Sequence, residues 1–311
     1  MFLLSFVPFV SFVVKRFCVF LAHIQQTGAS MLIVDSQVHI WAASTPQRPW
    51  PARHAPHRPE PFGADDLLKE MNAAGVDAVI IVPPGWEGDR NDLGLEAARL
   101  HPTRFAVMGR LDPTTSESRS MVSRWRKQPG MLGLRFTFHT AQMEPLLTEG
   151  HLDWLWSEAE KHGVPLMVLV PPRLLPAIRK VAEEHPGLRL TLDHMSIPKG
   201  KKDGEAFAHF DDLVKLASTP NVAVKATSLS HYTTDPYPHH AAHGALKKVI
   251  DAFGPRRVFW GTDLTKLKPG TYREAVTMFT EEMPWLSAAD KNWIMGRGLC
   301  EWLGWAHPRL E

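Results

Sequence analysis

The chain has 311 residues, of which 44% are hydrophobic and 22% are charged, values typical of a water-soluble globular protein with a large core. A formal net charge of +2 and the lack of any long run of like charge exclude an electrostatic requirement for nucleic acid or an anionic membrane. The two cysteines, Cys18 and Cys300, are too few for a disulfide framework or a cysteine metal site. We therefore expect inert thiols in a reducing cytoplasm.

The first 30 residues differ in character from the rest of the chain. They are apolar but carry Lys15 and Arg16 in the middle, whereas a signal peptide places its positive charges first. Neither apolar flank reaches the ~20 uninterrupted residues of a membrane-spanning helix. Met31 stands directly before the first convincing strand. We expect residues 1–30 to be a dispensable leader or an over-extended start, with a membrane anchor less favoured, and one domain over 31–311.

From residue 31 onward, short β-rich runs alternate with polar loops and amphipathic helices. The first predicted strand, 32–35, leads to a loop over 42–63 that is too rich in proline for a helix. The other predicted strands are 77–83, 104–112, 131–138, 164–170, 188–194, 221–227 and 257–263. The predicted helices are 64–74, 93–101, 118–128, 151–162, 174–185, 205–218 and 240–253, with further helices to the C-terminus.

Eight strands, each followed by a helix, predict an α/β fold and, specifically, a single-domain (β/α)8 TIM barrel. Several strands are apolar on both faces, as buried parallel strands are, and the helices supply the crossover connections. An open doubly wound sheet is the alternative, but no glycine-rich phosphate loop follows the first strand. In a barrel of this kind the chemistry takes place at the carboxyl ends of the strands.

Polar residues stand at or near the ends of most predicted strands. They are Gln37 and His39 (first strand), Arg110 and Asp112 (third), Arg135 and His139 (fourth), Arg173 (fifth), Asp193 and His194 (sixth), Lys225, His231 and Tyr232 (seventh) and Asp263 (eighth). Charged groups in apolar strands are costly unless they are paired or face a wet cavity. We therefore expect these side chains to line a functional site.

Structural roles compete with functional ones for several of these residues. His39 alone could be a satisfied structural histidine, and Asp193 could orient a ring nitrogen of a neighbour. Because strand side chains alternate, we expect Asp193 and His194 to face different ways. An internal ion pair and substrate binding explain Arg135 and Lys225 equally well.

The segments VDSQVHIW, GLRF, LDH, NVAVK and FWGTD, in this order at the strand ends, resemble the amidohydrolase-related group of the amidohydrolase superfamily. Within it, the chain is similar to a lactonase-like branch that includes 2-pyrone-4,6-dicarboxylate lactonase. In the superfamily, a His-x-His, two further histidines and a final aspartate usually hold metal. By this resemblance His39, His194 and Asp263 match, but Gln37 replaces the first histidine and the end of strand five, LVLVPP, lacks one.

The resemblance implies a hydrolase that opens a carboxylated lactone or a similar cyclic ester, and we favour a metal-free site. A neutral glutamine is a weak ligand, and the loss of imidazoles should cost metal affinity. If Zn²⁺ or Mn²⁺ is bound, His39, His194 and Asp263 would hold it, with His139 or His231 as further ligands.

In this interpretation Asp263 is the general base, and a low-dielectric pocket raises its proton affinity. His39, His194 and Lys225 stabilise the developing oxyanion, and Gln37 adds a neutral amide donor.

Substrate binding is assigned to a second set of residues. Arg135, with Arg110 or Arg173, would hold a substrate carboxylate, since a guanidinium matches a carboxylate in geometry. Trp41 and Trp260 would face a flat ring, although core packing explains Trp260 equally well.

Two other functions stay open at this point. One is a metal-dependent non-oxidative decarboxylase of an aromatic or unsaturated acid, against which Gln37 argues. The other is a barrel that binds a small acid without catalysis. In each case the partner is a small acidic molecule, with no nucleic acid or membrane, and a homo-oligomer is compatible with the sequence.

Overall fold

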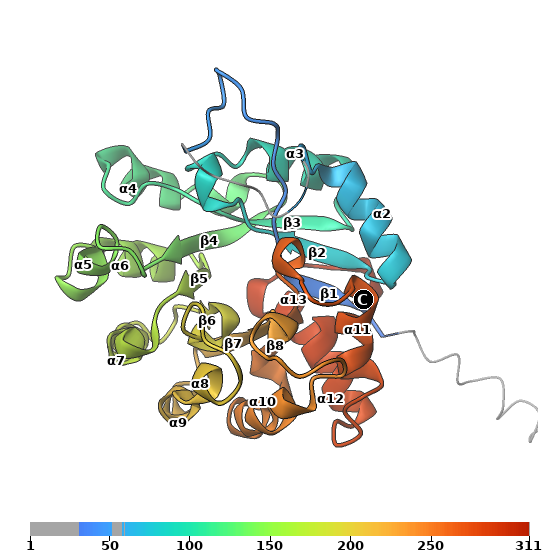
Figure 1. Cartoon of the computed structure of the whole chain (residues 1–311). Coiled ribbons are helices and arrows are strands. Elements are labelled where there is room, and N and C mark those ends of the chain that lie inside the picture. The colour runs from blue at the N-terminus through green and yellow to red at the C-terminus, as the bar shows by residue number, and fades with distance from the viewer. Residues whose placement is uncertain (1–30, 52–57, 59, 311) are drawn as a thin grey trace, which may run out of the picture. The chain divides into compact units, whose positions relative to one another are not determined.

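A computed structural model describes residues 31–51, 58 and 60–310 of the chain, so the interpretation of residues 1–30 lies outside the described residues. Eight parallel strands follow one another in chain order around a nearly closed barrel (Figure 1). The strands are β1 (Val34–Val38), β2 (Ala78–Ile81), β3 (Phe105–Gly109), β4 (Met131–Thr137), β5 (Leu166–Leu169), β6 (Leu190–Leu192), β7 (Val222–Thr227) and β8 (Val258–Gly261). The predicted barrel is therefore confirmed.

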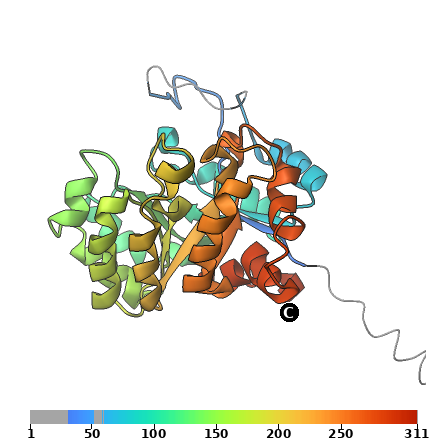
Figure 2. The ribbon, with the colours of Figure 1, turned by 60° about the horizontal axis from the view of Figure 1, so that its bottom comes forward.

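Helices surround the strands in Figure 1, and the side view in Figure 2 shows several of them running alongside the sheet. They are α2 (Ala64–Ala74), α3 (Asp92–Leu100), α4 (Ser116–Val122), α5 (Glu144–Thr148), α6 (Asp153–Lys161), α7 (Leu175–Glu184), α8 (Asp203–Phe207), α9 (Phe210–Leu213), α10 (His240–Phe253), α11 (Tyr272–Thr280), α12 (Ala288–Asn292) and α13 (Gly298–Leu303). No helix in the described part of the chain is both long enough and apolar enough to cross a membrane.

Several predicted elements have other bounds in the structure, and three of these differences have a visible cause. The helix expected over 118–128 ends at Val122, and Trp125 beyond it donates from Nε1 to the Gly133 carbonyl (2.8 Å). The helix expected over 205–218 is broken between α8 and α9, where the His209 ring bonds the Met195 carbonyl (2.9 Å). The sixth strand, expected to reach residue 194, ends two residues earlier. In each case a tertiary contact or a turn overrides the local pattern.

The two edges of the sheet, β8 and β1, are joined largely by a side chain. No ladder pair connects these strands in the described residues, but Asp263 N donates to Gln37 O (2.9 Å). The buried carboxylate of Asp35 accepts Thr262 N (2.9 Å) and Thr262 Oγ1 (2.5 Å), as well as the hydroxyl of Tyr272 (2.9 Å). Asp35 thus supplies acceptors that a backbone ladder would otherwise provide.

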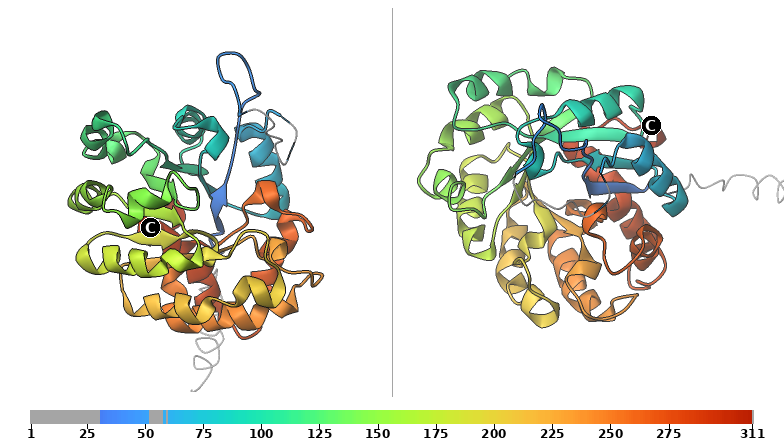
Figure 3. Two further views of the ribbon diagram at one scale, coloured as in Figure 1. Left: turned by 60° about the vertical axis from the view of Figure 1, so that its left-hand side comes forward. Right: turned by 45° about the horizontal axis from the view of Figure 1, so that its top comes forward.

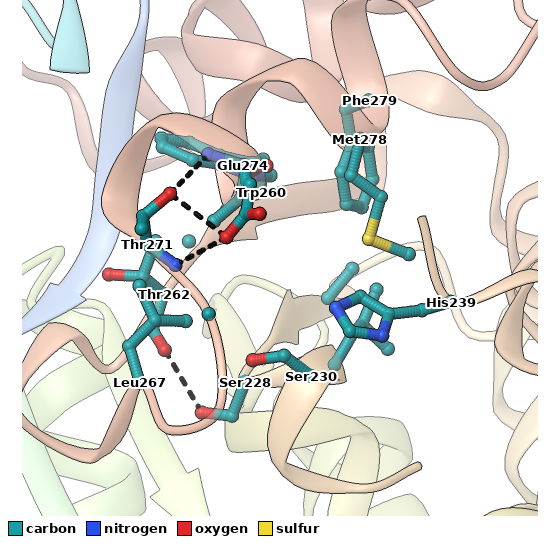
Figure 4. A pocket seen from close by; sticks show the side chains of 15 residues that line it. Ser228, Ser230, His239, Trp260, Thr262, Leu267, Thr271, Glu274, Met278 and Phe279 are labelled. Carbon is teal, nitrogen blue, oxygen red and sulfur yellow. Dashed lines mark hydrogen bonds between the residues drawn. The ribbon is translucent and has the colours of Figure 1, made fainter. Parts of the chain in front are cut away.

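Tyr272 reaches this seam because it is the first residue of α11. The helix starts with a capping box, in which Glu274 N donates to Thr271 Oγ1 (3.1 Å) and Thr271 N donates to the Glu274 carboxylate (2.7 Å), as Figure 4 shows. The cap fixes where α11 begins and therefore where the Tyr272 hydroxyl lies.

Register shifts in β1 and β4 change which side chains face the barrel interior. Pairing of β1 with β2 shifts between Asp35 and Val38, and pairing of β4 with β3 shifts beside Met131. A bulge inserts an extra residue and so re-aims the side chains that follow it. Within the first shift, Gln37 bonds Lys225 across the barrel, whereas Asp35 at its start bonds Tyr272 of α11.

The floor of the barrel is apolar. Buried side chains from seven strands, including Val34, Ile80 and Phe259, pack in one cluster with Leu299 and Cys300 of α13. Burial, with a smaller contribution from the Glu301 charge, raises the pKa of the Cys300 thiol to about 12, so this cysteine is the inert thiol that was expected.

Candidate active site

Three of the predicted site residues converge at the carboxyl ends of β1, β6 and β8. The carboxylate of Asp263 has Oδ1 at 3.2 Å from His39 Nε2 and Oδ2 at 3.8 Å from His194 Nε2. All three side chains are largely buried. Figure 3 shows two further views of the barrel whose strand ends carry them. Residues distant in the sequence therefore form one polar cluster, here called the Asp263 cluster.

Both rings are held from their far sides. His39 Nδ1 lies 2.5 Å from the Val82 carbonyl, which only accepts, so Nδ1 carries a proton and Nε2 faces Asp263. His194 Nδ1 lies 2.5 Å from Thr227 Oγ1, a hydroxyl that can donate or accept. The orientation of each ring is thus fixed by a group on a neighbouring strand or strand end.

The backbone at three adjacent strand ends is left-handed. His194 (φ 51°), Ser228 (φ 61°) and Asp263 (φ 51°) follow β6, β7 and β8, respectively, and none is glycine. Non-glycine residues in this region store local strain, which concentrates at functional sites. The turn away from the strand brings the side chains of His194 and Asp263 together.

A buried ionic network adjoins the Asp263 cluster. Asp193 accepts Arg135 Nε (3.0 Å) on one carboxylate oxygen and lies 2.8 Å from Lys225 Nζ with the other. Lys225, which is 0% exposed, also donates to Gln37 Oε1 (2.7 Å). Gln37 in turn has its amide nitrogen 3.5 Å from His39 Nε2. Arg135 and Lys225 therefore each form an internal ion pair with Asp193, which was one of the two interpretations of these residues.

The expectation that Asp193 and His194 face different ways is wrong. β6 ends at Leu192, and His194 and Met195 adopt left-handed conformations, so strand alternation does not apply to them. Both side chains join connected parts of one polar assembly, and Asp193 pairs with cations instead of bracing a histidine.

The pKa of Asp263, the predicted base, is shifted in the direction opposite to the prediction. Burial alone would raise the pKa of Asp263, but the hydrogen bond to His39 and the charges of Lys266, His39 and His194 hold that pKa well below its usual range. The expected upward shift is therefore wrong in direction. Burial lowers the pKa of His194 to about 4, against the opposing charges of Asp263 and Asp193, so this ring is neutral at pH 7.

The superfamily resemblance implies a divalent metal, for which the side chains of the Asp263 cluster would have to supply the ligand atoms. Within the described residues, no group of three or more His, Cys, Asp or Glu side chains is arranged to hold a metal ion. Asp263 directs its two oxygens at His39 and His194, and Lys266 Nζ already lies 3.4 Å from Oδ2. The Gln37 oxygen is taken by Lys225. As arranged, these side chains do not fit a resident metal.

Four of the predicted substrate-binding residues make no hydrogen bond or ion pair with Asp263 among the described residues. Trp41 is fully buried and packs edge-on against Trp86, at 5.5 Å between ring centroids. Trp260 stacks on Tyr272, outside the barrel, and donates to Ala275 O, which is the core interpretation. Arg173 has a side chain that is 60% exposed and paired with Glu144. Arg110 is mostly buried, and its Nε and Nη1 find no hydrogen-bond partner among the described residues.

Sequence reasoning missed two residues beside the cluster. Lys266 follows Asp263 by three residues in a short 3₁₀ turn, a spacing that brings its ammonium back to the carboxylate. Trp86, in the loop after β2, has its ring centroid 6.4 Å from that of His39. The three-residue spacing from Asp263 was a readable signal, whereas the position of Trp86 depends on tertiary structure.

A separate pocket lies behind the ends of β7 and β8, as Figure 4 shows. Ser228 lines it and donates to the Thr262 carbonyl (3.2 Å), and the same hydroxyl lies 3.5 Å from His194 Nδ1. The opposite wall is apolar and includes Met278 and Phe279 of α11. This pocket lies against the strand ends, but none of its lining residues belongs to the Asp263 cluster.

The fold and the cluster together are those of a (β/α)8-barrel enzyme, with ionisable side chains at the carboxyl ends of the strands. The chain belongs to the amidohydrolase family, whose model, described as "Amidohydrolase", matches residues 34–297. The predicted resemblance is therefore confirmed. Members of this superfamily usually use divalent metals.

Two curated relatives are similar over most of the chain. An L-fucono-1,5-lactonase from Burkholderia ambifaria is 25% identical over 233 residues, which cover 74% of this chain and 79% of the relative. A 4-sulfomuconolactone hydrolase from Hydrogenophaga intermedia is 24% identical over 243 residues, covering 74% of this chain and 73% of the relative. Both relatives are named for the hydrolysis of a lactone.

Solved structures share the fold. An amidohydrolase from Burkholderia multivorans with bound zinc has a TM-score of 0.74 at 23% identity and covers 88% of this chain and 99% of its own. A probable 2-pyrone-4,6-dicarboxylic acid hydrolase from Acinetobacter baumannii, with citric acid bound, has a TM-score of 0.68 at 16% identity and covers 88% and 100%. At these identities the likeness establishes the barrel and not the substrate.

Proposed function

We propose that this enzyme hydrolyses a lactone, or a similar cyclic ester, that carries an anionic group. The observation that carries the proposal is the Asp263 carboxylate, which lies between the ring nitrogens of His39 (3.2 Å) and His194 (3.8 Å) at the barrel mouth. The names of the curated relatives support a lactone as the scissile group. The cations around the cluster support an anionic substrate.

In the proposed reaction, Asp263 takes a proton from a water molecule as the water oxygen attacks the lactone carbonyl carbon. Asp263 is ionised near neutral pH, which is the form that a base requires. The carbonyl oxygen gains negative charge, and His194 can donate to it from Nε2 when Thr227 donates to Nδ1. The ring C–O bond then breaks, and the departing oxygen takes a proton from His39 or from Asp263.

We also propose that the enzyme works without a metal. The support is that Gln37 stands in place of a histidine, with its amide oxygen bonded to Lys225, and that Lys266 brings a positive charge to Asp263. A polar network of this kind can stabilise a developing oxyanion with fixed donors.

Replacement of the base tests the function. Purified Asp263→Asn should lose hydrolysis of carboxylated lactones by about 10²- to 10⁴-fold in kcat, because an amide cannot take a proton from water. The matched control is Asp112→Asn at an exposed strand end, where the asparagine oxygen can still accept Thr114 N (2.9 Å), and its activity should stay at the wild-type level. Circular dichroism checks that both variants fold.

Near-full turnover by Asp263→Asn would contradict its role as the base. Release of CO₂ from an aromatic acid by the wild-type enzyme would favour the decarboxylase alternative. Thermal stabilisation by small acids, with no product from any of them, would favour the non-catalytic barrel.

A further inference from the structure

The proposed function, on which this inference rests, needs a cation that an anionic substrate can reach beside Asp263. Two of the nearby cations cannot serve. Lys225 is 0% exposed and is held by Asp193 (2.8 Å) and Gln37 (2.7 Å). Arg135 is 8% exposed, and its Nε donates to Asp193 (3.0 Å). Their charges are neutralised inside the barrel.

The other two arginines are also poorly placed. Arg173 is exposed but pairs with Glu144 of α5, and among the described residues no hydrogen bond or ion pair joins it to the Asp263 cluster. Arg110 is mostly buried, and burial together with the charge of Arg135 lowers its pKa to about 10. Arg110 forms no ion pair with Asp263 among the described residues.

Lys266 combines contact with the cluster and access to solvent. Its Nζ lies 3.4 Å from Asp263 Oδ2, and its side chain is 42% exposed, whereas that of Asp263 is 2% exposed. The ammonium therefore covers the buried carboxylate from the solvent side. At 3.4 Å the ion pair is longer than a charge-assisted hydrogen bond, so the flexible lysine stem can release it at small cost.

Lys266 also faces the other groups at the mouth. After burial, its charge is among the causes that lower the pKa of His139, together with Arg135 and Lys199, and that of His231, together with Lys202. These histidines come from the loops after β4 and β7. The charge of Lys266 therefore acts on side chains from the loops after β4 and β7 as well as on Asp263.

We propose that Lys266 is a specificity-determining residue: its ammonium leaves Asp263 to bind an anionic group of the substrate beside the scissile ester. The interaction anchors the anionic lactone next to the base and frees the carboxylate for water. Because a single ammonium binds a carboxylate or a sulfonate equally well as a point charge, the substrate class is an anionic lactone and not an uncharged sugar lactone.

Binding and turnover are measured separately to test this. Citrate serves as an unreactive polycarboxylate probe in calorimetry at low salt. 2-Pyrone-4,6-dicarboxylate and uncharged L-fucono-1,5-lactone serve as substrates. Lys266→Met should weaken citrate binding and lower kcat/KM for the dicarboxylate by about 10- to 100-fold, the range for a hydrogen bond to a charged group. Its kcat/KM for the uncharged lactone should fall by a smaller factor than that for the dicarboxylate, because the uncharged lactone offers no anionic group to Lys266.

Two further variants control for charge and for folding. Lys266→Arg keeps the cation and should restore citrate binding to within about fivefold of the wild type. Lys268→Met removes the same charge from the same loop, where no ion pair of Lys268 is found among the described residues, and should leave binding and turnover unchanged.

The outcomes separate this inference from the proposed function. In one outcome the wild type binds citrate and Lys266→Met loses that binding, while the wild type turns over neither lactone. This result would contradict the lactonase proposal and support the anion site at Lys266. Turnover of the dicarboxylate that is equal in Lys266→Met and wild type would overturn the role of Lys266 and leave the lactonase standing. Failure of the wild type to bind citrate would also overturn it.

Discussion

Individual residues determine what kind of cation stands beside Asp263. A metal site in this barrel would need free donor atoms, but the Gln37 oxygen is bonded to Lys225 and the Asp263 carboxylate is shared by His39, His194 and Lys266. The ammonium supplies positive charge without a coordination shell. The amidohydrolase from Burkholderia multivorans, which shares the fold, has bound zinc, so the metal-free proposal needs a direct test.

The metal-free proposal predicts the result of chelation. After dialysis against EDTA, the wild-type enzyme should keep its lactone-hydrolysing activity, because its positive charge near Asp263 comes from Lys266. Elemental analysis of the same sample should find less than a tenth of an equivalent of zinc or manganese (a threshold set on the order of trace contamination). Activity that disappears with the metal and returns with Zn²⁺ would contradict the proposal.

The sequence placed the right residue types at the right strand ends, since His39, His194 and Asp263 were selected from their positions and do meet. It could not place Lys225 and Asp193 in one buried pair, because pairing across a barrel depends on register. The direction of the Asp263 pKa shift was also out of reach. Burial and neighbouring cations oppose each other there, and only distances decide which prevails.

At the scale of elements, the seam between β8 and β1 depends on close approach of the two strands. A Cβ built on Gly261 would lie 2.5 Å from Ser36 Oγ and 2.8 Å from Asp35 Oδ1, and Asp35 is fixed by its bonds to Thr262 and Tyr272. Only a residue without a side chain leaves room for these contacts. The strand pattern predicted β8 but contained no sign of this constraint.

The Gly261→Ala variant should therefore be less stable than the wild type by about 1–3 kcal/mol, because the methyl group must displace buried polar atoms. Urea unfolding followed by fluorescence measures the difference. Gly244→Ala is the matched control, since it lies in α10 with nothing within 4 Å of the added Cβ, and should be neutral or stabilising. Equal stability of the two variants would show that the seam can open without cost.

At the scale of the whole molecule, histidines that lose contact with water on folding connect the fold to pH. Desolvation is the largest cause lowering the pKa of six of them: His139, His194, His209, His231, His243 and His307. A histidine whose folded pKa lies below its unfolded value stabilises the protein fully above the unfolded pKa, and this contribution is lost as the pH falls. Asp35, whose burial raises its pKa to about 6, and Asp89, whose pKa is also raised by desolvation, act in the opposite sense, but they are two groups against six.

The unfolding free energy should thus fall when the pH is lowered from 6.5 toward 4. His194 alone, with a pKa of about 4, accounts for about 2 kcal/mol between pH 6.5 and pH 5. Urea unfolding at pH 7 and pH 5 measures this loss, and His194→Asn should show a shallower dependence on pH. A wild-type protein that is equally stable at both pH values would contradict the prediction.

The register shift in β1 has a consequence for insertions and deletions in the gene. Asp35 bonds α11 outside the barrel, whereas Gln37, within the shift, and His39, beyond it, face inward. The three steps from Asp35 to Val38 span only two steps of β2, so removing one codon there would restore regular pairing and leave His39 facing inward. Adding one codon just before His39, without a second bulge, would instead turn this ring toward the helix layer. Such a chain would keep every residue discussed here and most of its hydrophobic pattern, yet it would have lost the His39 imidazole from the mouth. At this strand, chain length matters for activity as much as residue identity.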